Sequence, residues 1–285
     1  KTEPINGKPV ILKIMINGNE HRMLLENISR SRQFGKDVYK LSGRSPTALL
    51  DAPYSPTRSF TQESERTSVQ LVQAELDRVN SDVVLNWDLI DALGWILPPE
   101  SLSYSNLTPI AAIKLIVEAA GGFIYSEPNS NTLTIKPRYK KTWWDSIVVE
   151  EYDRVIPESI VTDQSTDYQP YPDYNGVFLT NDRTGDTGQV KRIGTSGDVL
   201  QESINNPLLT STTVMHSKGR DILAKAGLVE NHSLLMPITQ EIGLCLPGEL
   251  VAFNGDWWGI VDGVSGSFTH KLVNQTVSIE RVNRE

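Results

Sequence analysis

Apolar residues recur at helical spacing most clearly within residues 107–122. Four apolar positions lie three or four residues apart and share one helical face: Ile110, Ile113, Val117 and Ala120. A stripe of this kind has to pack against other apolar side chains. We therefore predict a helix here whose inner face belongs to a core.

The two ends of this helix carry start and stop signals. Thr108 is expected to cap it through the hydroxyl, and Pro109 suits the first helical position, where a backbone N–H has no intrahelical partner. Gly121-Gly122 ends the helix because glycine accepts the left-handed backbone of a C-terminal cap. Two short β-rich runs around a Pro-Asn-Ser-Asn turn then predict a hairpin over 123–126 and 132–137.

Two further segments show helical patterns. Thr67–Val79 places its valines and Leu76 on one face, and a short helix is expected within His216–Gly227, closed by Gly227. Between the first two helices, Asp82–Trp87 has the composition of a strand. The middle of the chain therefore predicts an α+β block.

The start of the chain shows strand patterns instead. Pro9–Ile16 alternates loosely, and Asn17-Gly18 supports the positive φ angles of a type I′ hairpin turn. His21–Ile28 is then the return strand, and Asp37–Gly43 a third strand. Three consecutive strands with tight turns predict a small barrel or sandwich segment.

The second half of the chain is also mostly strand-like. Tyr168–Tyr174 holds two prolines and is expected to be an extended loop. The predicted strands are Ser159–Asp163, Gly176–Thr180, Gly188–Arg192, His232–Pro237, Leu250–Asn254, Trp257–Val264 and Leu272–Arg281.

These patterns predict a mainly β protein with an α+β insertion, in which two small β-barrel-like domains are joined by a helix-containing insertion. The first barrel-like segment is expected over residues 1–60 and the insertion over 61–141. The second barrel-like domain, with extended linking strands, is expected over 142–285.

Composition narrows the range of functions. The chain of 285 residues has a formal net charge of −8, which argues against a dedicated DNA- or RNA-binding protein with a basic footprint. Its one cysteine, Cys245, excludes an internal disulfide and any cysteine-based zinc site, and the apolar context predicts a buried, inert thiol. No apolar run reaches the roughly 18–20 residues that span a bilayer, and the sequence as given shows no signal-peptide pattern, so we expect no stable membrane binding.

The chain shows no catalytic or metal-binding pattern. The four histidines lie in separate predicted elements, at the surface or in turns by our expectation: His21, His216, His232 and His270. The acidic loop Asn181–Gly188 lacks the ligand spacing of a calcium site, and motifs for nucleotide phosphates, serine hydrolases and zinc peptidases do not occur. The acidic pair Glu150-Glu151 is expected on opposite faces of a solvated edge strand. We therefore predict no catalytic residue, cofactor or metal ion, and no enzymatic activity.

The tryptophan pairs Trp143-Trp144 and Trp257-Trp258 are the best remaining candidates for a site. In a strand, one ring of each pair would face the core and the other the surface. An outward ring can stack on a sugar or join a subunit interface. Packing plus an interface is the favoured pair of roles, with Trp144 and Trp257 as the candidate interface residues.

Several short motifs together carry a family resemblance. They are the strand–Asn-Gly–strand order near the start, Gly43–Asp51, Leu107–Ile113 with Ala119–Tyr125, and the C-terminal Leu246–Val251 with Trp258–Val261. In this order they resemble the tail hub (baseplate hub) proteins of tailed bacteriophages and Mu-like prophages, relatives of the type VI secretion spike hub.

The resemblance implies a structural role in the virion. It implies a homotrimer with pseudo-sixfold symmetry, which joins the hexameric tail tube or distal tail protein to a spike, fibre or tip protein. DNA would pass through the lumen only in transit. Such a protein is made in the host bacterial cytoplasm and lies at the distal end of the tail. Hub proteins usually have a strand or two ahead of the region matching Pro9–Gly43, which suggests that Lys1 is an internal start or a trimmed terminus.

Other functions remain open at this point. The chain can be a carbohydrate-binding or cell-wall-degrading tail component whose exposed tryptophans contact glycans, or a domain of a larger host-recognition protein. A hydrolase would need an essential carboxylate, whereas a hub needs only its interfaces. The net charge of −8 also suits a channel through which DNA slides without sticking, because like charges remove phosphate binding.

Overall fold

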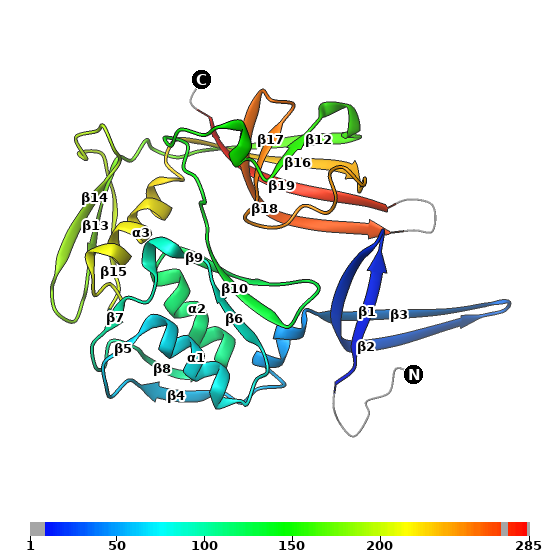
Figure 1. Ribbon diagram of the computed structural model, residues 1–285, viewed down its shortest axis with the longest axis horizontal. Coiled ribbons are helices and arrows are strands. Elements are labelled where there is room, and N and C mark those ends of the chain that lie inside the picture. Colours follow the sequence, from blue (N-terminus) through cyan, green and yellow to red (C-terminus); the bar gives the residue numbers. More distant parts are fainter. Residues whose placement is uncertain (1–8, 269–272, 284–285) are drawn as a thin grey trace.

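The computed structural model describes residues 9–268 and 273–283. In this part of the chain, three α-helices and several open sheets form a flattened body (Figure 1). The prediction of a mainly β protein with an α+β insertion is confirmed, and no sheet among the described residues closes into a barrel.

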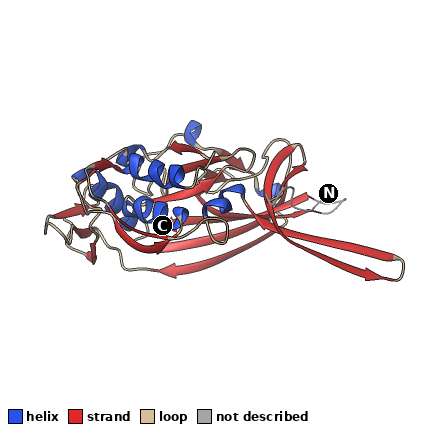
Figure 2. Cartoon of the chain, turned by 90° about the horizontal axis from the view of Figure 1, so that it is seen from below, coloured by secondary structure: helices blue, strands red, loops and turns tan. Residues whose placement is uncertain are grey.

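The N-terminal strands form a three-stranded sheet in the order β1-β2-β3. Its strands are β1 (Ile11–Ile16), β2 (Asn19–Gln33) and β3 (Lys36–Arg44). The turn between the first two is confirmed, since Asn17 and Gly18 both have positive φ, at 47° and 85°. The second strand runs five residues beyond the predicted Ile28, so β2 and β3 form a long hairpin that projects from the body (Figure 2).

A β-bulge lies at the root of this hairpin. The register between β2 and β3 shifts between Leu25 and Asn27, which places one extra residue, Glu26, in β2. Opposite the bulge, a Cβ atom on Gly43 would lie 1.8 Å from the Leu24 carbonyl oxygen. Only glycine fits at this position, because a bulge brings the two backbones unusually close.

The insertion packs two helices against short strands. Helices α1 (Ser68–Arg78) and α2 (Pro109–Ala119) pack against a sheet of β6 (Val84–Trp87), β10 (Thr132–Pro137) and β9 (Gly122–Ser126). Both predicted helices and the predicted hairpin are thereby confirmed. Two small ribbons complete the block: β4 (Arg58–Thr61) with β8 (Ser103–Leu107), and β5 (Arg66–Thr67) with β7 (Ile96–Leu97).

The two helices begin differently. The α1 helix has a capping box, in which the Gln70 N–H donates to the Thr67 hydroxyl at 3.2 Å and the Thr67 N–H donates to the Gln70 side chain at 2.9 Å. The predicted hydroxyl cap of α2 is wrong. The Thr108 hydroxyl instead donates to Asp51 Oδ1 at 3.1 Å, because that carboxylate, just after the 3₁₀ turn Pro46–Leu50, is a charged and therefore stronger acceptor.

The end of α2 is also a packing point. Gly121 has φ +71°, as a left-handed helix end requires, and a Cβ there would lie 2.6 Å from Asp221 Cβ. Asp221 belongs to α3 (Thr212–Leu223), which begins four residues before the predicted start because the Ser211 hydroxyl caps it. The α3 helix ends at Leu223, four residues before Gly227, so the predicted closure by Gly227 is wrong.

A small three-stranded sheet lies against α3. Its order is β14 (Thr187–Lys191), β13 (Gly176–Thr180) and β15 (Leu200–Asn205), and the last of these strands was not predicted. Apolar residues of β13 and α3 share one core with those of α1, α2 and β10. This larger core therefore joins the helices of the insertion to residues 176–223, and the predicted domain boundaries stay a prediction.

The C-terminal part forms an open six-stranded sheet. Its order is β11 (Arg154–Ile156), β17 (Leu250–Phe253), β18 (Trp257–Phe268), β19 (Val273–Asn283), β16 (Leu228–Pro237) and β12 (Asp163–Pro170). The predicted strands in β16 to β19 are confirmed, with Leu272 outside the described residues. One face of the sheet buries a second core that includes Leu234, Val261, Val277 and Ile279.

Two predictions about β12 are wrong. Ser159–Asp163 is not a strand, because Glu158–Ile160 forms a 3₁₀ turn, and the strand begins only at Asp163. The predicted loop from Tyr168 starts too early, since β12 continues to Pro170 in register with β16. Proline is tolerated there because β12 is an edge strand, where a missing N–H breaks no ladder.

The buried face of α2 generates a direct test. Ile113 is 0% exposed, so Ile113→Asp would bury an unpaired carboxylate and should lower the free energy of unfolding by several kcal/mol, to be measured by denaturant titration. Leu115→Asp is the matched control on the same helix, because Leu115 is 39% exposed. Equal losses in the two variants would show that the buried face does not hold the fold.

Candidate functional site

The described residues hold no group of three or more His, Cys, Asp or Glu side chains that could bind a metal ion. His21 and His216 lie in separate elements, β2 and α3, and His270 lies outside the described residues. Glu150 and Glu151 belong to a 3₁₀ turn rather than the predicted edge strand, and Glu151 pairs with Lys141 at 2.7 Å. In the part of the chain described, none of these groups forms a catalytic cluster.

His232 corrects the expectation of surface histidines, because it is buried in β16. Its Nε2 lies 2.9 Å from Glu230 Oε2, and its Nδ1 lies 2.9 Å from the Thr166 hydroxyl. These partners fit a neutral ring that donates from Nε2 and accepts at Nδ1. Burial lowers the pKa of His232 below its usual value, although Glu230 acts in the opposite direction.

Glu230 is a buried carboxylate with several donors. Burial alone would raise its pKa, but hydrogen bonds from Asn283 and His232 and the charge of Arg281 outweigh that effect, so the pKa lies below its usual value. The His232 ring also stacks on Trp257 at a centroid distance of 4.2 Å. Glu230 and His232 thus form a buried polar pair on the sheet, and their contacts stabilise its packing.

The tryptophan pairs differ from each other. Trp143-Trp144 lies in a turn, so the expected alternation of a strand does not apply, and the two rings meet edge to face at 5.1 Å. Trp144 packs against the larger core. Trp257 lies in β18 and stacks on His232 and, at 4.9 Å, on Phe253. A role of Trp144 and Trp257 at an interface stays a prediction.

The two pairs nevertheless meet at one cleft. Trp143, Trp257 and Trp258 line a hollow of about 300 Å³ beside β18 and β19, together with charged side chains. Those charged residues are Lys141, Asp256, Glu280 and Arg281. An aromatic and charged lining of this kind can accept a polar ligand with an apolar face.

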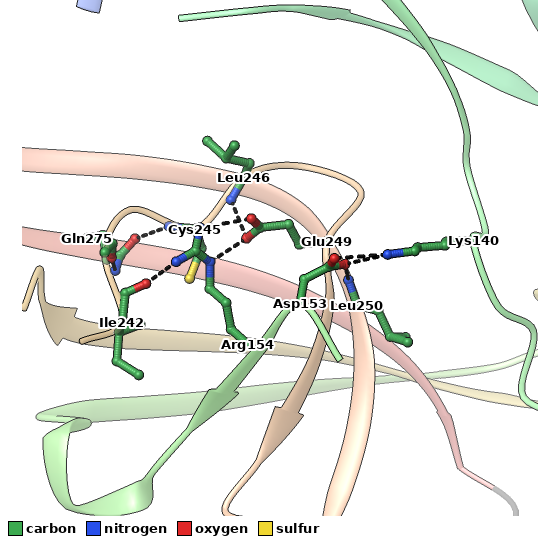
Figure 3. Close-up of polar contacts among 10 residues, drawn as sticks. Lys140, Asp153, Arg154, Ile242, Cys245, Leu246, Glu249, Leu250 and Gln275 are labelled. Atoms are coloured by element: carbon green, nitrogen blue, oxygen red, sulfur yellow. Dashed lines mark hydrogen bonds and ion pairs between the residues drawn. The ribbon is translucent and has the colours of Figure 1, made fainter. Parts of the chain in front are cut away.

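A polar network fastens the loop between β16 and β17 to the second core (Figure 3). Arg154 donates to both carboxylate oxygens of Glu249, at 2.7 and 2.9 Å, and also to the Ile242 carbonyl. Gln275 accepts from the Cys245 N–H at 2.9 Å and donates to the Gly243 carbonyl at 2.8 Å. The loop is therefore a fixed part of the sheet domain rather than an open flap.

Cys245 lies within this network and behaves as predicted. Its thiol is 1% exposed, and burial raises its pKa to about 12. The thiolate is the reactive form of cysteine, so this side chain is inert near neutral pH.

On the face of the six-stranded sheet away from the second core, two adjacent rows of side chains are exposed or half-buried, and we call this the serine-rich face. Ser165, Ser233 and Ser278 lie directly opposite one another across β12, β16 and β19. The adjacent row, in cross-strand order, is Asp163, Leu235, Thr276 and Ser265. These two rows contain hydroxyl and carboxylate groups and no lysine or arginine.

The projecting hairpin is the second uncovered surface, and we call residues Asn27–Gly43 the arm. Most of its side chains are exposed. The exposed apolar side chains include Phe34 at the tip and Ile28, Tyr39 and Leu41 along the strands. Sequence reasoning missed the arm because Ser29-Arg30-Ser31-Arg32 lacks the apolar alternation of a half-buried strand. Gly35, which lies between two polar runs and has a positive φ of 74°, was the sequence signal available for the turn of the arm.

No protein-family model and no curated protein matches this sequence. Solved structures do match its fold. The tail protein from Neisseria meningitidis MC58 superposes with a TM-score of 0.62 at 12% identity, over 95% of this chain and 83% of that one. The 43 kDa tail protein of prophage MuSo2 from Shewanella oneidensis gives 0.56 at 13% identity, over 97% and 82%. This chain has the fold of phage tail proteins.

The same tail-protein fold extends to a secretion component. The E. coli c3393 protein, a component of the type VI secretion system similar to T4 bacteriophage tail proteins, gives a TM-score of 0.51 at 10% identity, over 96% of this chain and 63% of that one. The resemblance drawn from short sequence motifs is thus confirmed at the level of fold. No described helix within this tail-protein fold is long and apolar enough to cross a membrane.

The buried His232 predicts a pH dependence of stability. Its pKa is lower in the folded state than in the unfolded chain, so the unfolded state gains a proton first and stability falls as the pH drops below about 6.5. The lowered pKa of Glu230 adds a further loss at more acidic pH. Denaturant unfolding between pH 8 and pH 5 should show this decline.

His232→Gln should flatten the decline between pH 7 and pH 5, because glutamine can still donate to Glu230 but does not titrate. His216→Gln, at an exposed histidine of α3, is the matched control and should keep the wild-type slope. An unchanged slope in the His232 variant would show that another group titrates.

Proposed function

We propose that this chain is a non-enzymatic structural hub of a phage tail tip or baseplate. The observation that carries the proposal is the tail-protein fold, which aligns with a known tail protein over 95% of the chain. The uncovered surfaces support it, since a structural part of an assembly needs contact surfaces rather than a reactive centre.

The hub is a homotrimer with pseudo-sixfold symmetry. In this arrangement each chain offers similar sheet surfaces twice around a ring, which matches the hexameric tail tube or distal tail protein on one side. The spike, fibre or tip protein attaches on the other side. The ring lies at the distal end of the virion tail, after synthesis in the host bacterial cytoplasm.

The serine-rich face lines the channel through which DNA leaves. Its two rows carry hydroxyl groups and the carboxylate of Asp163, and they offer no cation for a phosphate. Because phosphate contacts with lysine and arginine supply most of non-specific DNA affinity, a wall without them lets DNA pass without sticking.

The proposed ring can be tested by measuring the mass of the particle and by imaging it. The purified chain should scatter light as a particle of about 95 kDa, three times the 31.7 kDa of one chain, because the ring is a homotrimer. A reconstruction of that particle should place Ser165, Ser233 and Ser278 on the inner wall. A monomer at every concentration would contradict the hub, and a wall lined by lysine and arginine without acidic partners would contradict the assigned channel face.

The aromatic cleft favours one alternative function, a carbohydrate-binding or cell-wall-degrading tail component. In that case Trp258→Ala, which removes a ring from the cleft, should abolish co-sedimentation of the chain with peptidoglycan. Trp87→Ala is the control on a tryptophan outside the cleft. Wild-type chain that stays in the supernatant excludes this alternative.

A further inference from the structure

The arm has one apolar face that nothing in its own chain covers. Cross-strand register places Ile28 opposite Leu41 and Arg30 opposite Tyr39, so these four side chains share a face. Ile28, Tyr39 and Leu41 are 40%, 58% and 39% exposed. A two-stranded ribbon is marginally stable by itself in water, so this apolar face calls for a partner.

The charge of the arm indicates the charge of the surface that it would bind. Residues 27–43 carry four basic side chains and one acidic one, a net +3 in a chain of net −8, which leaves −11 on the rest. Arg30 is engaged with Asp37 at 2.9 Å, but Lys36 and Lys40 on β3 have no ion-pair partner among the described residues. The arm therefore fits an acidic surface, and the rest of this chain, with a net charge of −11, can offer one.

The edge strand β12 is such a surface. It ends the six-stranded sheet, all but one of its eight residues are exposed, and its outer edge presents unpaired backbone groups. The stretch from Val155 to Asp182 contains five acidic residues and no lysine or arginine. Asp163 and Asp167 have no ion-pair partner within the described part of the chain.

The two edges match in spacing. Lys36 and Lys40 lie four residues apart on one face of β3, and Asp163 and Asp167 lie four residues apart on one face of β12. When the strands lie side by side in this register, both lysines meet both aspartates. Tyr39 and Leu41 then share the opposite face with Tyr168, which is 63% exposed.

We propose that β3 of one copy pairs with β12 of a second copy, so that the arm joins neighbouring subunits into a continuous sheet. Within one chain β3 and β12 lie in different parts of the molecule (Figure 1), so the pairing is head-to-tail, as a ring requires. This inference rests on the proposed ring and names the contact that closes it.

A disulfide tests the contact directly. Val38 lies midway between the two lysines and Ser165 midway between the two aspartates, so they are opposite each other whether the strands run parallel or antiparallel. The chain with Val38→Cys and Ser165→Cys should form reducible covalent dimers and trimers under mild oxidation. The buried Cys245 does not compete, because its thiol is 1% exposed. The control, Val38→Cys with Ser105→Cys on exposed β8, should stay uncrosslinked.

Charge exchange tests the same contact without a covalent bond. Lys36→Glu with Lys40→Glu should weaken subunit association roughly tenfold, measured by light scattering against concentration. Adding Asp163→Lys and Asp167→Lys to that chain should restore the association. Lys114→Glu with Lys191→Glu carries the same charge change on exposed residues outside the arm and should assemble as the wild type does.

The outcomes separate this inference from the proposed function. A wild-type ring that shows no disulfide and no rescue overturns the β3–β12 contact and leaves the hub in place. A charge variant that keeps the ring but no longer joins another tail protein assigns the arm to that protein and also overturns the contact. A wild-type chain that never self-associates contradicts the hub itself.

Discussion

Burial of α2 is the constraint on which the rest of the structure depends. Its residues Ile113, Ile116 and Val117 are 0% exposed, and they pack in one core with α1, with β10, and with elements from residues 176–223. Segments far apart in the sequence therefore meet on a single helix. The six-stranded sheet has its own second core, and neither core includes a residue of the arm, so the arm can carry an uncovered surface without loss of the fold.

The chain buries its apolar side chains unevenly. The six-stranded sheet covers one face with the loop that Arg154 and Glu249 hold in place, while the serine-rich face stays open. The arm covers neither of its faces. A monomer gains nothing from an exposed apolar ribbon and an exposed strand edge, but an assembly gains specific contacts from both.

Sequence reasoning worked where local signals agree with the final packing. Asn17-Gly18, the stripe on α2 and the hairpin after Gly121 each follow from backbone preferences that the fold keeps. Sequence reasoning failed where a residue distant in the sequence determines the contact of a side chain. The Thr108 hydroxyl contacts Asp51 rather than the start of its own helix, and His232 is buried by strands that the sequence does not place beside it.

The same limit applies to the candidate site. The tryptophan pairs were visible as residue types, but the structure brings three of the four rings to one cleft and covers Trp257 with Phe253 and His232. The serine-rich face depends on register across three strands, and serine has no hydrophobic period to reveal it. Surfaces built from several strands need the topology before they can be seen.

The bulge at the root of the arm has a consequence for how such proteins diverge. Side chains of a strand alternate between faces, so losing the one extra residue, Glu26, would turn every outward position of β2 beyond it to the other side. The three solved structures compared above are 10–13% identical to this chain. A single insertion or deletion at the bulge would be enough to present a different surface of the arm on an unchanged body. Variation in length at one position, rather than many substitutions, can thus change the surface that the arm presents.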